Sequence, residues 1–271
     1  MTGILLFKTA VAVYLASTIL YGVSLLGKRV FPARIAAGVL FAALVIHTLF
    51  IAARWLPAGE TRTVGLHDAL SFFAWFTAAV YLAFQLRTKT RVLGAFVAPL
   101  ICLFMVISSV GLGDAMNAST TLSGSLVWIH MILSVAGEAL FAVASCAGLM
   151  YLIQDGLIRR KQSRKWSRLL PSLGDLDRIN HICLLWGVPL LTLGGLAGSF
   201  WARIVWGSHW QWDPTQVWTL LAWCCYALLL HQRLAIGWRG RTAARWSLAV
   251  FILLALLMAG MPFFGTAHRF V

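Results

Sequence analysis

The sequence predicts an all-α, polytopic membrane protein with about eight transmembrane helices and with both termini on the outer side of the membrane. Three observations support this prediction. The 271-residue chain is 61% hydrophobic with a mean hydropathy of +0.85, its apolar residues form eight long runs, and most of its basic residues fall on one side of those runs. Only 11% of the residues are charged, which differs strongly from the composition of a water-soluble domain.

Each apolar run has about 18 residues or more, enough for a helix to cross the hydrocarbon core of a bilayer. The first run follows Met1-Thr2-Gly3 with no basic segment before it and no small-residue cleavage site, so we expect it to remain as a helix. We therefore predict a single transmembrane domain over 1–271, with spans at 4–26, 35–53, 67–86, 92–112, 125–153, 180–203, 215–236 and 246–264. A basic connector is expected at about 154–179.

The basic residues indicate how the spans are oriented. If the N-terminus lies outside, 17 of the 22 basic residues fall on the cytoplasmic side, as the positive-inside rule requires. The 17 residues are Lys28, Arg29, Arg34, Arg87, Lys89, Arg91, Arg159, Arg160, Lys161, Arg164, Lys165, Arg168, Arg178, Arg233, Arg239, Arg241 and Arg245. The formal net charge of +14 is then a topology signal with some attraction to anionic lipid. We expect a lipid bilayer as a partner, and no nucleic acid.

An aromatic segment is expected on the outside, in a loop at about 201–218. It reads Trp206-Gly207-Ser208-His209-Trp210-Gln211-Trp212-Asp213-Pro214, and six tryptophans fall within the 23 residues from Trp201 to Trp223. Interfacial belts usually place one or two tryptophans at a helix end, so this cluster indicates a flat aromatic surface for a large planar ligand. Asp213-Pro214 suits the N-cap and the first residue of the next helix, and this structural role is compatible with a part in the chemistry.

Two histidines are predicted at the depth of this loop. His130 lies near the outer start of the fifth span, and His268 lies just beyond the outer end of the eighth. Imidazole is a good ligand for iron, and two imidazoles on opposite sides of an aromatic surface could hold a haem through both axial positions. The alternative is that each is an ordinary polar side chain at the level of the lipid headgroups. The tryptophan cluster beside them favours the haem hypothesis.

His231 is predicted at a different depth. It follows Asp213 by 18 residues, about 27 Å along a continuous helix, which places it near the cytoplasmic face. An ionisable residue within a span is a functional candidate. His47 is expected in the outer half of the second span, so the two are not expected to ligate one iron. If His231 is a ligand, we expect its mate to come from another polypeptide.

Other polar residues near the span ends have two interpretations each. His67, at the outer start of the third span, suits a helix cap or an interfacial position as well as chemistry, and His209 inside the loop is equally open. Arg203 could pair with carboxylates of an amphiphilic ligand or be an ordinary interfacial charge. Glu138 lies within the fifth span, where it needs a partner or a wet cavity. His181 is expected to be solvated at the cytoplasmic surface.

The loop motif Trp206-Gly207-x-x-Trp210-x-Trp212-Asp213-Pro214 resembles the WWD signature of haem-handling proteins in cytochrome c maturation. From about residue 35 to the C-terminus the chain is similar to the CcsA (ResC) type of the system II haem lyase. The other segments that carry this resemblance include Ser71-Phe72-Phe73-Ala74-Trp75, Leu126-x-x-x-His130, Pro171-Ser172-Leu173-x-x-Leu176-Asp177 and Leu230-His231-x-Arg233.

The resemblance implies specific haem ligands. His130 and His268 match the external pair that ligates haem b at the WWD loop, and His231 matches a histidine that ligates haem within the membrane, opposite a ligand from a CcsB (ResB) subunit. The loop residues implied to bind haem are Trp206, Trp210, Trp212 and Asp213. The family moves haem outward and presents its vinyl groups to the thiols of a Cys-x-x-Cys-His apocytochrome c. The chain would then be a subunit of holocytochrome c synthase in a bacterial inner (cytoplasmic) or thylakoid-type membrane, active on the outer face.

The chain also departs from the family pattern. Thr215-Gln216 stands after Asp213-Pro214 where the family usually has Lys-Glu, so one carboxylate is missing. Three functions from different classes follow as hypotheses. The chain is a subunit of the synthase, or a haem transporter or chaperone that delivers haem to a dedicated partner without attaching it, or a membrane anchor or regulator that would not need the loop and the histidines.

The predicted orientation can be checked without reference to haem. The loops predicted to be cytoplasmic hold most of the positive charge. Topology reporters fused after Arg34, Arg91, Lys165 and Arg241 should therefore report a cytoplasmic location. Reporters fused near Glu60, Asn117, Ser208 and the C-terminus should report a location on the outer side of the membrane. A cytoplasmic C-terminus would remove His268 from the predicted external site.

Overall fold

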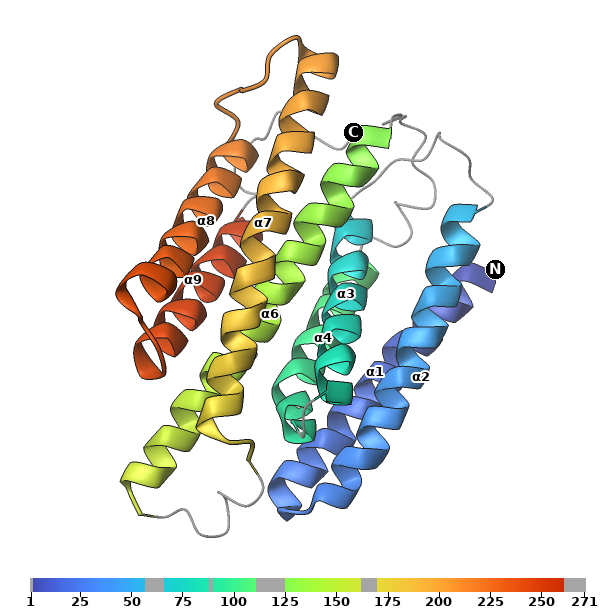
Figure 1. Cartoon of the computed structure of the whole chain (residues 1–271). Helices are drawn as coiled ribbons and strands as arrows, with labels where there is room; N and C mark the ends of the chain where they lie inside the picture. The colour runs from blue at the N-terminus through green and yellow to red at the C-terminus, as the bar shows by residue number, and fades with distance from the viewer. Residues whose placement is uncertain (1, 57–65, 88–89, 111–124, 162–169, 261–271) are drawn as a thin grey trace.

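The computed structural model describes residues 2–56, 66–87, 90–110, 125–161 and 170–260, and within these ranges the regular structure is entirely helical (Figure 1). The elements are α1 (Thr2–Gly27), α2 (Val30–Trp55), α3 (Leu66–Arg87), the 3₁₀ turn η2 (Arg91–Leu93), α4 (Gly94–Val110), α6 (Ser125–Arg159), α7 (Leu173–Trp206), α8 (Pro214–His231), the π-helical turn η3 (Gln232–Ile236) and α9 (Arg241–Gly260). Within the described ranges, seven helices, all but α9, are long and apolar enough to cross a membrane. The predicted all-α membrane fold is confirmed, while the orientation of its ends stays a prediction from charge.

Several helices extend beyond the predicted spans. α2 begins at Val30 rather than at 35, since Pro32 falls in the first turn, where no intrahelical N–H bond is lost. α6 continues to Arg159, and α7 begins already at Leu173. Ser172 caps α7, with its hydroxyl oxygen accepting the Asp175 N–H at 3.0 Å. The basic connector expected at about 154–179 is therefore shorter than predicted.

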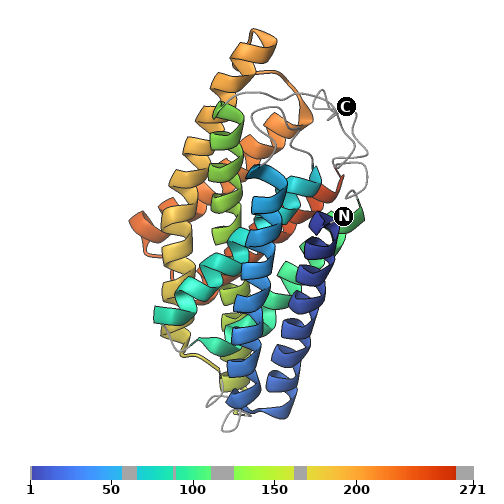
Figure 2. The same ribbon diagram turned by 90° about the vertical axis from the view of Figure 1, so that its right-hand side faces the viewer.

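α6 is the central helix of the bundle. It packs against α7, α9, α3 and α4, while α1 and α2 form a long hairpin at one side (Figures 1 and 2). The main core lies among α1, α2, α3 and α4 with parts of α6 and α7, and a second core joins α6 to α7, α8 and α9. The last described helices therefore pack around α6 and α7.

The contact between α6 and α7 depends on glycine. A Cβ added to Gly137 would lie 3.0 Å from the Gly187 carbonyl oxygen, and a Cβ on Gly194 would lie 2.3 Å from Ser134 Oγ. Small residues of this kind let two helix backbones approach closely in a membrane, where packing and hydrogen bonds hold helices together. This close approach brings side chains of α6 against the backbone of α7.

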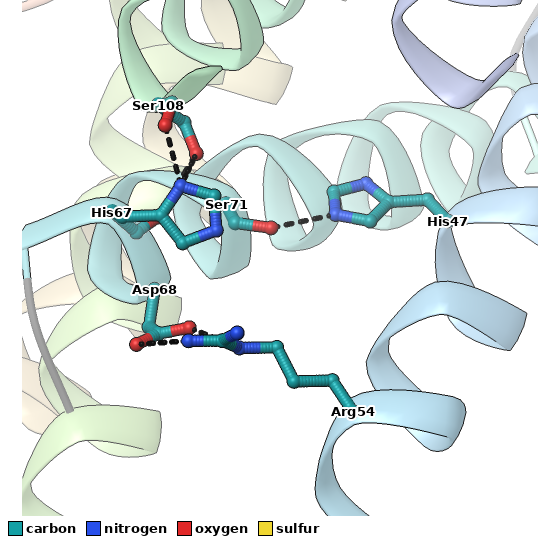
Figure 3. A network of polar contacts seen from close by, with 6 residues as sticks. All are labelled: His47, Arg54, His67, Asp68, Ser71 and Ser108. Atoms are coloured by element: carbon teal, nitrogen blue, oxygen red, sulfur yellow. Dashed lines mark hydrogen bonds and ion pairs between the residues drawn. The ribbon is translucent and has the colours of Figure 1, made fainter. Parts of the chain in front are cut away.

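Buried polar side chains connect α2, α3 and α4 (Figure 3). Arg54 of α2 forms an ion pair with Asp68 of α3 at 2.8 Å, and their side chains are only 4% and 2% exposed. His47 Nε2 lies 2.9 Å from Ser71 Oγ, while Ser108 Oγ lies 2.9 Å from His67 Nδ1. Charged groups buried in this way are tolerated because each has a partner.

The Arg54–Asp68 pair gives a test of this network. Asp68→Asn would remove the buried carboxylate that lies 2.8 Å from the Arg54 guanidinium, so we expect the free energy of unfolding to fall by about 3–5 kcal/mol. Arg159→Gln is the matched control, because Arg159 pairs with Asp155 from a side chain that is 62% exposed, and such pairs contribute about 1 kcal/mol or less. Thermal unfolding of both variants in detergent measures the difference, and equal shifts would contradict it.

Candidate functional site

The predicted aromatic loop joins α7 to α8, at the same end of the bundle as the start of α6 (Figure 1). α7 ends at Trp206, and Gly207 follows in the left-handed conformation with φ of 73°, donating its N–H to the Arg203 carbonyl oxygen at 2.9 Å. A glycine adopts this conformation without the strain that a Cβ would cause. The chain thus turns sharply out of α7 into the loop.

His209 fastens the first half of the loop to α7. Its Nε2 accepts a hydrogen bond from Arg203 Nη1 at 2.8 Å, and its Nδ1 lies 3.3 Å from the Ser199 carbonyl oxygen. The Ser199 hydroxyl in turn donates to the His209 carbonyl oxygen at 3.0 Å. Both ring nitrogens are used within the protein, so His209 is a structural residue of the loop. Arg203, considered from the sequence as a ligand-pairing residue, serves this anchor.

The second half of the loop is closed by a glutamine. Gln216 Oε1 accepts the Gln211 N–H at 2.7 Å, which links the loop to the first turn of α8. Asp213 is buried, and its carbonyl oxygen accepts the Val217 N–H at 3.1 Å. Pro214 is the first residue of α8, as predicted from the preference of proline for that position.

The tryptophans of the loop do not share one plane. Trp201 and Trp206 meet at 73° with their centroids 5.2 Å apart, and Trp210 and Trp212 meet at 89° with centroids 5.7 Å apart. Edge-to-face contacts are favoured because the ring edge is positive and the ring face negative. The flat surface expected from the sequence is therefore two angled pairs. Trp212 is 85% exposed and Trp210 is 37% exposed, so both present apolar ring surface outside the protein core.

His130 is held firmly against α7. Its Nδ1 lies 2.7 Å from the Gly194 carbonyl oxygen, which can only accept, so Nδ1 carries the proton and donates. The ring lies over Gly198, where an added Cβ would be 2.6 Å from His130 Nδ1 and 2.8 Å from Cε1. A neutral imidazole protonated on Nδ1 has its lone pair on Nε2. Metal-ligating histidines are usually oriented by such a bond from the other ring nitrogen.

This arrangement fits an iron ligand. Two features are needed, a fixed ring and a lone pair on the opposite nitrogen, and the backbone of α7 provides both for His130. Gly194, Gly198, Ser199 and Arg203 all lie near the end of α7, so one helix positions both His130 and the tryptophan loop. His268, the predicted second ligand, lies outside the described residues.

His231 lies far from this group, as predicted. It is the last residue of α8, opposite the loop end of that helix, and its side chain is exposed at the surface of the bundle. The 18 residues of α8 span about 27 Å. The helix was expected to continue unchanged to 236, but it widens after His231 into the π-helical turn η3.

The remaining histidines have structural partners. His47 contacts Tyr14 through Nδ1 at 3.3 Å and Ser71 through Nε2 at 2.9 Å, so both of its nitrogens are engaged. His67 is buried against Ser108 rather than capping a helix or facing an interface (Figure 3). His181, expected to be solvated, accepts a bond from Arg233 at 3.2 Å.

Sequence reasoning missed the contacts that join the motifs. Arg233 forms an ion pair with Asp177 at 2.9 Å, which joins two segments that the sequence singled out separately. The signal was an arginine within an apolar run, which requires a buried acceptor. The anchor of His209 to Ser199 and Arg203 had no such signal, because Ser199 suits a helix interior and Arg203 and His209 suit an interface without any contact among the three.

Comparison with known proteins places these features in a family. Residues 63–268 match the family described as cytochrome C assembly protein. The chain is similar to the cytochrome c biogenesis protein CcsA of Guillardia theta, with 27% identity over 93% of this chain and 90% of the relative. It is also similar to CcsA of a Synechocystis species, with 26% identity over 95% of this chain and 94% of the relative.

The contact between His130 and Gly198 can be tested directly. In Gly198→Ala the new methyl group would collide with the imidazole, so His130 would lose its bond to Gly194, and we expect haem retained by the purified protein to fall roughly tenfold or more. Gly195→Ala is the matched control, because a Cβ there meets no described heavy atom within 4 Å. Haem would be measured as its pyridine complex. Equal retention in the two variants would show that α7 does not position His130.

Proposed function

The chain belongs to the cytochrome c assembly protein family, as its loop motif predicted, and on that premise we propose that it binds haem b beside the tryptophan loop and presents it to an apocytochrome c. His130 and His268 are the proposed axial ligands. The observation that supports this most is the orientation of His130, whose Nδ1–H bond to Gly194 directs the lone pair to Nε2. A polar side chain at a lipid interface has no need of this fixed tautomer.

The tryptophans supply the apolar part of the proposed site. Trp212 and Trp210 expose ring surface, and covering an aromatic ring with a planar apolar ligand gains both buried area and ring contacts. The His209 anchor keeps this half of the loop close to α7. In this proposal the ligand lies between these rings and His130. His209, whose two ring nitrogens have partners within the protein, is not among the proposed iron ligands.

The proposed attachment reaction requires the protein mainly to position its reactants. Bound haem supplies two vinyl groups, and addition of each cysteine thiol of a Cys-x-x-Cys-His segment forms one C–S bond and transfers the thiol hydrogen to the neighbouring carbon. No net oxidant or reductant enters this addition. The contribution of this chain is then to fix the haem and to leave its edge open to the apocytochrome, which is catalysis by proximity and orientation.

His231 is the proposed ligand of a second haem site, completed by a CcsB-type subunit. Its exposed position at the end of α8 leaves the imidazole accessible to another polypeptide. Its depth near the predicted cytoplasmic face suits a site that receives haem before the external one. In this proposal haem moves from His231 to His130, and the active face lies outside.

The loss of the family carboxylate after Asp213-Pro214 does not argue against attachment. Gln216 occupies that position, and its amide oxygen accepts the Gln211 N–H at 2.7 Å. A carboxylate could make the same bond, so the loop closure needs only an acceptor. This contact supports the synthase hypothesis over a transporter that has lost part of its loop.

The test measures haem binding and haem attachment separately, with a CcsB-type subunit and a Cys-x-x-Cys-His reporter coexpressed. His130→Gly should strip the external site of haem, and added imidazole should partly restore it by filling the vacated position. Alanine at both Trp210 and Trp212 should also lower haem content and abolish attachment. Normal haem content in both variants would contradict the site, while bound haem without attachment in the unaltered chain would favour a transporter.

A further inference from the structure

We propose that Arg233 is a positioning residue for His231, and that its ion pair with Asp177 fixes where the imidazole lies on the exposed face of α8. The inference rests on the proposed function of His231 as a haem ligand. Arg233 and Asp177 would then act through His231 without contacting the haem.

Arg233 is almost fully enclosed, with only 3% of its side chain exposed. Its guanidinium donates to Asp177 Oδ1 at 2.9 Å and to the Asp177 carbonyl oxygen at 3.1 Å. It also donates to Asn180 Oδ1 at 2.9 Å and to His181 Nδ1 at 3.2 Å. Arginine is suited to such a role because its planar fork of donors meets several acceptors in one fixed geometry.

The acceptors are themselves held in place. Asp177 Oδ1 also accepts the Gly240 N–H at 2.9 Å, so a single carboxylate holds both sides of the turn between α8 and α9. Asn180 donates to the Ala144 carbonyl oxygen at 2.9 Å and to Ser247 Oγ at 2.8 Å. Through these bonds Arg233 is connected to α6, α7 and α9, so it cannot shift without disturbing all three helices.

His231 and Arg233 are two residues apart but face opposite ways. His231 is exposed and Arg233 is buried, and the α-helix gives way to the π-helical turn η3 between them. π-helical turns are rare and often occur at functional sites. Residues two apart on a helix point in roughly opposite directions, so Arg233 faces α7, where it contacts Asp177 and Asn180, while His231 stays on the exposed face of α8. Fixing Arg233 therefore fixes the rotation of α8 and the depth of the imidazole.

The experiment uses the full chain coexpressed with a CcsB-type subunit, in a His130→Ala background that empties the external site. We expect Arg233→Gln and Asp177→Asn each to lower the low-spin haem signal of the purified complex at least fivefold. Added imidazole should restore that signal, because a free ligand needs no positioning by the helix. Arg233→Lys should retain more haem than Arg233→Gln, since it keeps the charge opposite Asp177. Arg239→Gln is the matched control, because exposed Arg239 lies in the adjoining turn.

The outcomes distinguish the positioning role of Arg233 from the proposed role of His231 as a haem ligand. Unchanged haem content and spectrum in Arg233→Gln would overturn the inference. A loss of haem that imidazole does not restore would also overturn it, because Arg233 would then hold the fold and not the ligand. His231→Gly serves as the reference: if that variant keeps its haem in the His130→Ala background, the proposed function of His231 is wrong, whatever Arg233 does.

Discussion

The close approach of α6 and α7 is the constraint on which the candidate site depends. Where the two backbones meet, Gly137, Gly187 and Gly194 leave no room for a side chain. In a bilayer, apolar side chains gain little by leaving lipid for another helix, so close packing and hydrogen bonds must supply the association. The same approach lets a carbonyl oxygen of α7 reach His130. Helix packing and ligand orientation thus have one structural cause.

Buried polar groups define the bundle at both of its ends. Near the start of α3, Arg54 and Asp68 neutralise each other between α2 and α3. Near the start of α7, Arg233 and Asp177 do so between η3 and α7. An unpaired charge at either place would be costly in an apolar medium, so these pairs restrict which helices can be neighbours. Breaking such a pair is strongly destabilising even where the intact pair adds little net stability.

The sequence predicted the helices well because the membrane imposes a simple rule of length and apolarity. Each expected span corresponds to a described helix, with errors at ends such as Val30 and Leu173, where Pro32 and the Ser172 cap extend the helix. The separation of His231 from Asp213 along α8 followed from helix geometry.

The contacts between helices were not predictable in this way. The roles of His67, His209 and Arg203 depend on which side chains face them from elsewhere in the chain, and no local pattern encodes that pairing. The number of tryptophans likewise led us to expect one flat aromatic surface. The angles between the rings are instead set by edge-to-face contacts between neighbouring rings.

α7 connects the two proposed haem sites. Asp177 and Asn180 near its start hold Arg233 beside His231, while Gly194 and Gly198 near its end hold His130. Asn180 and Gly198 are 18 residues apart in this helix, about 27 Å if it is straight. A haem is too small to contact both ligands at that separation. On the proposed function, the same molecule of haem must therefore leave one histidine before the other can bind it, and α7 sets the distance that it travels.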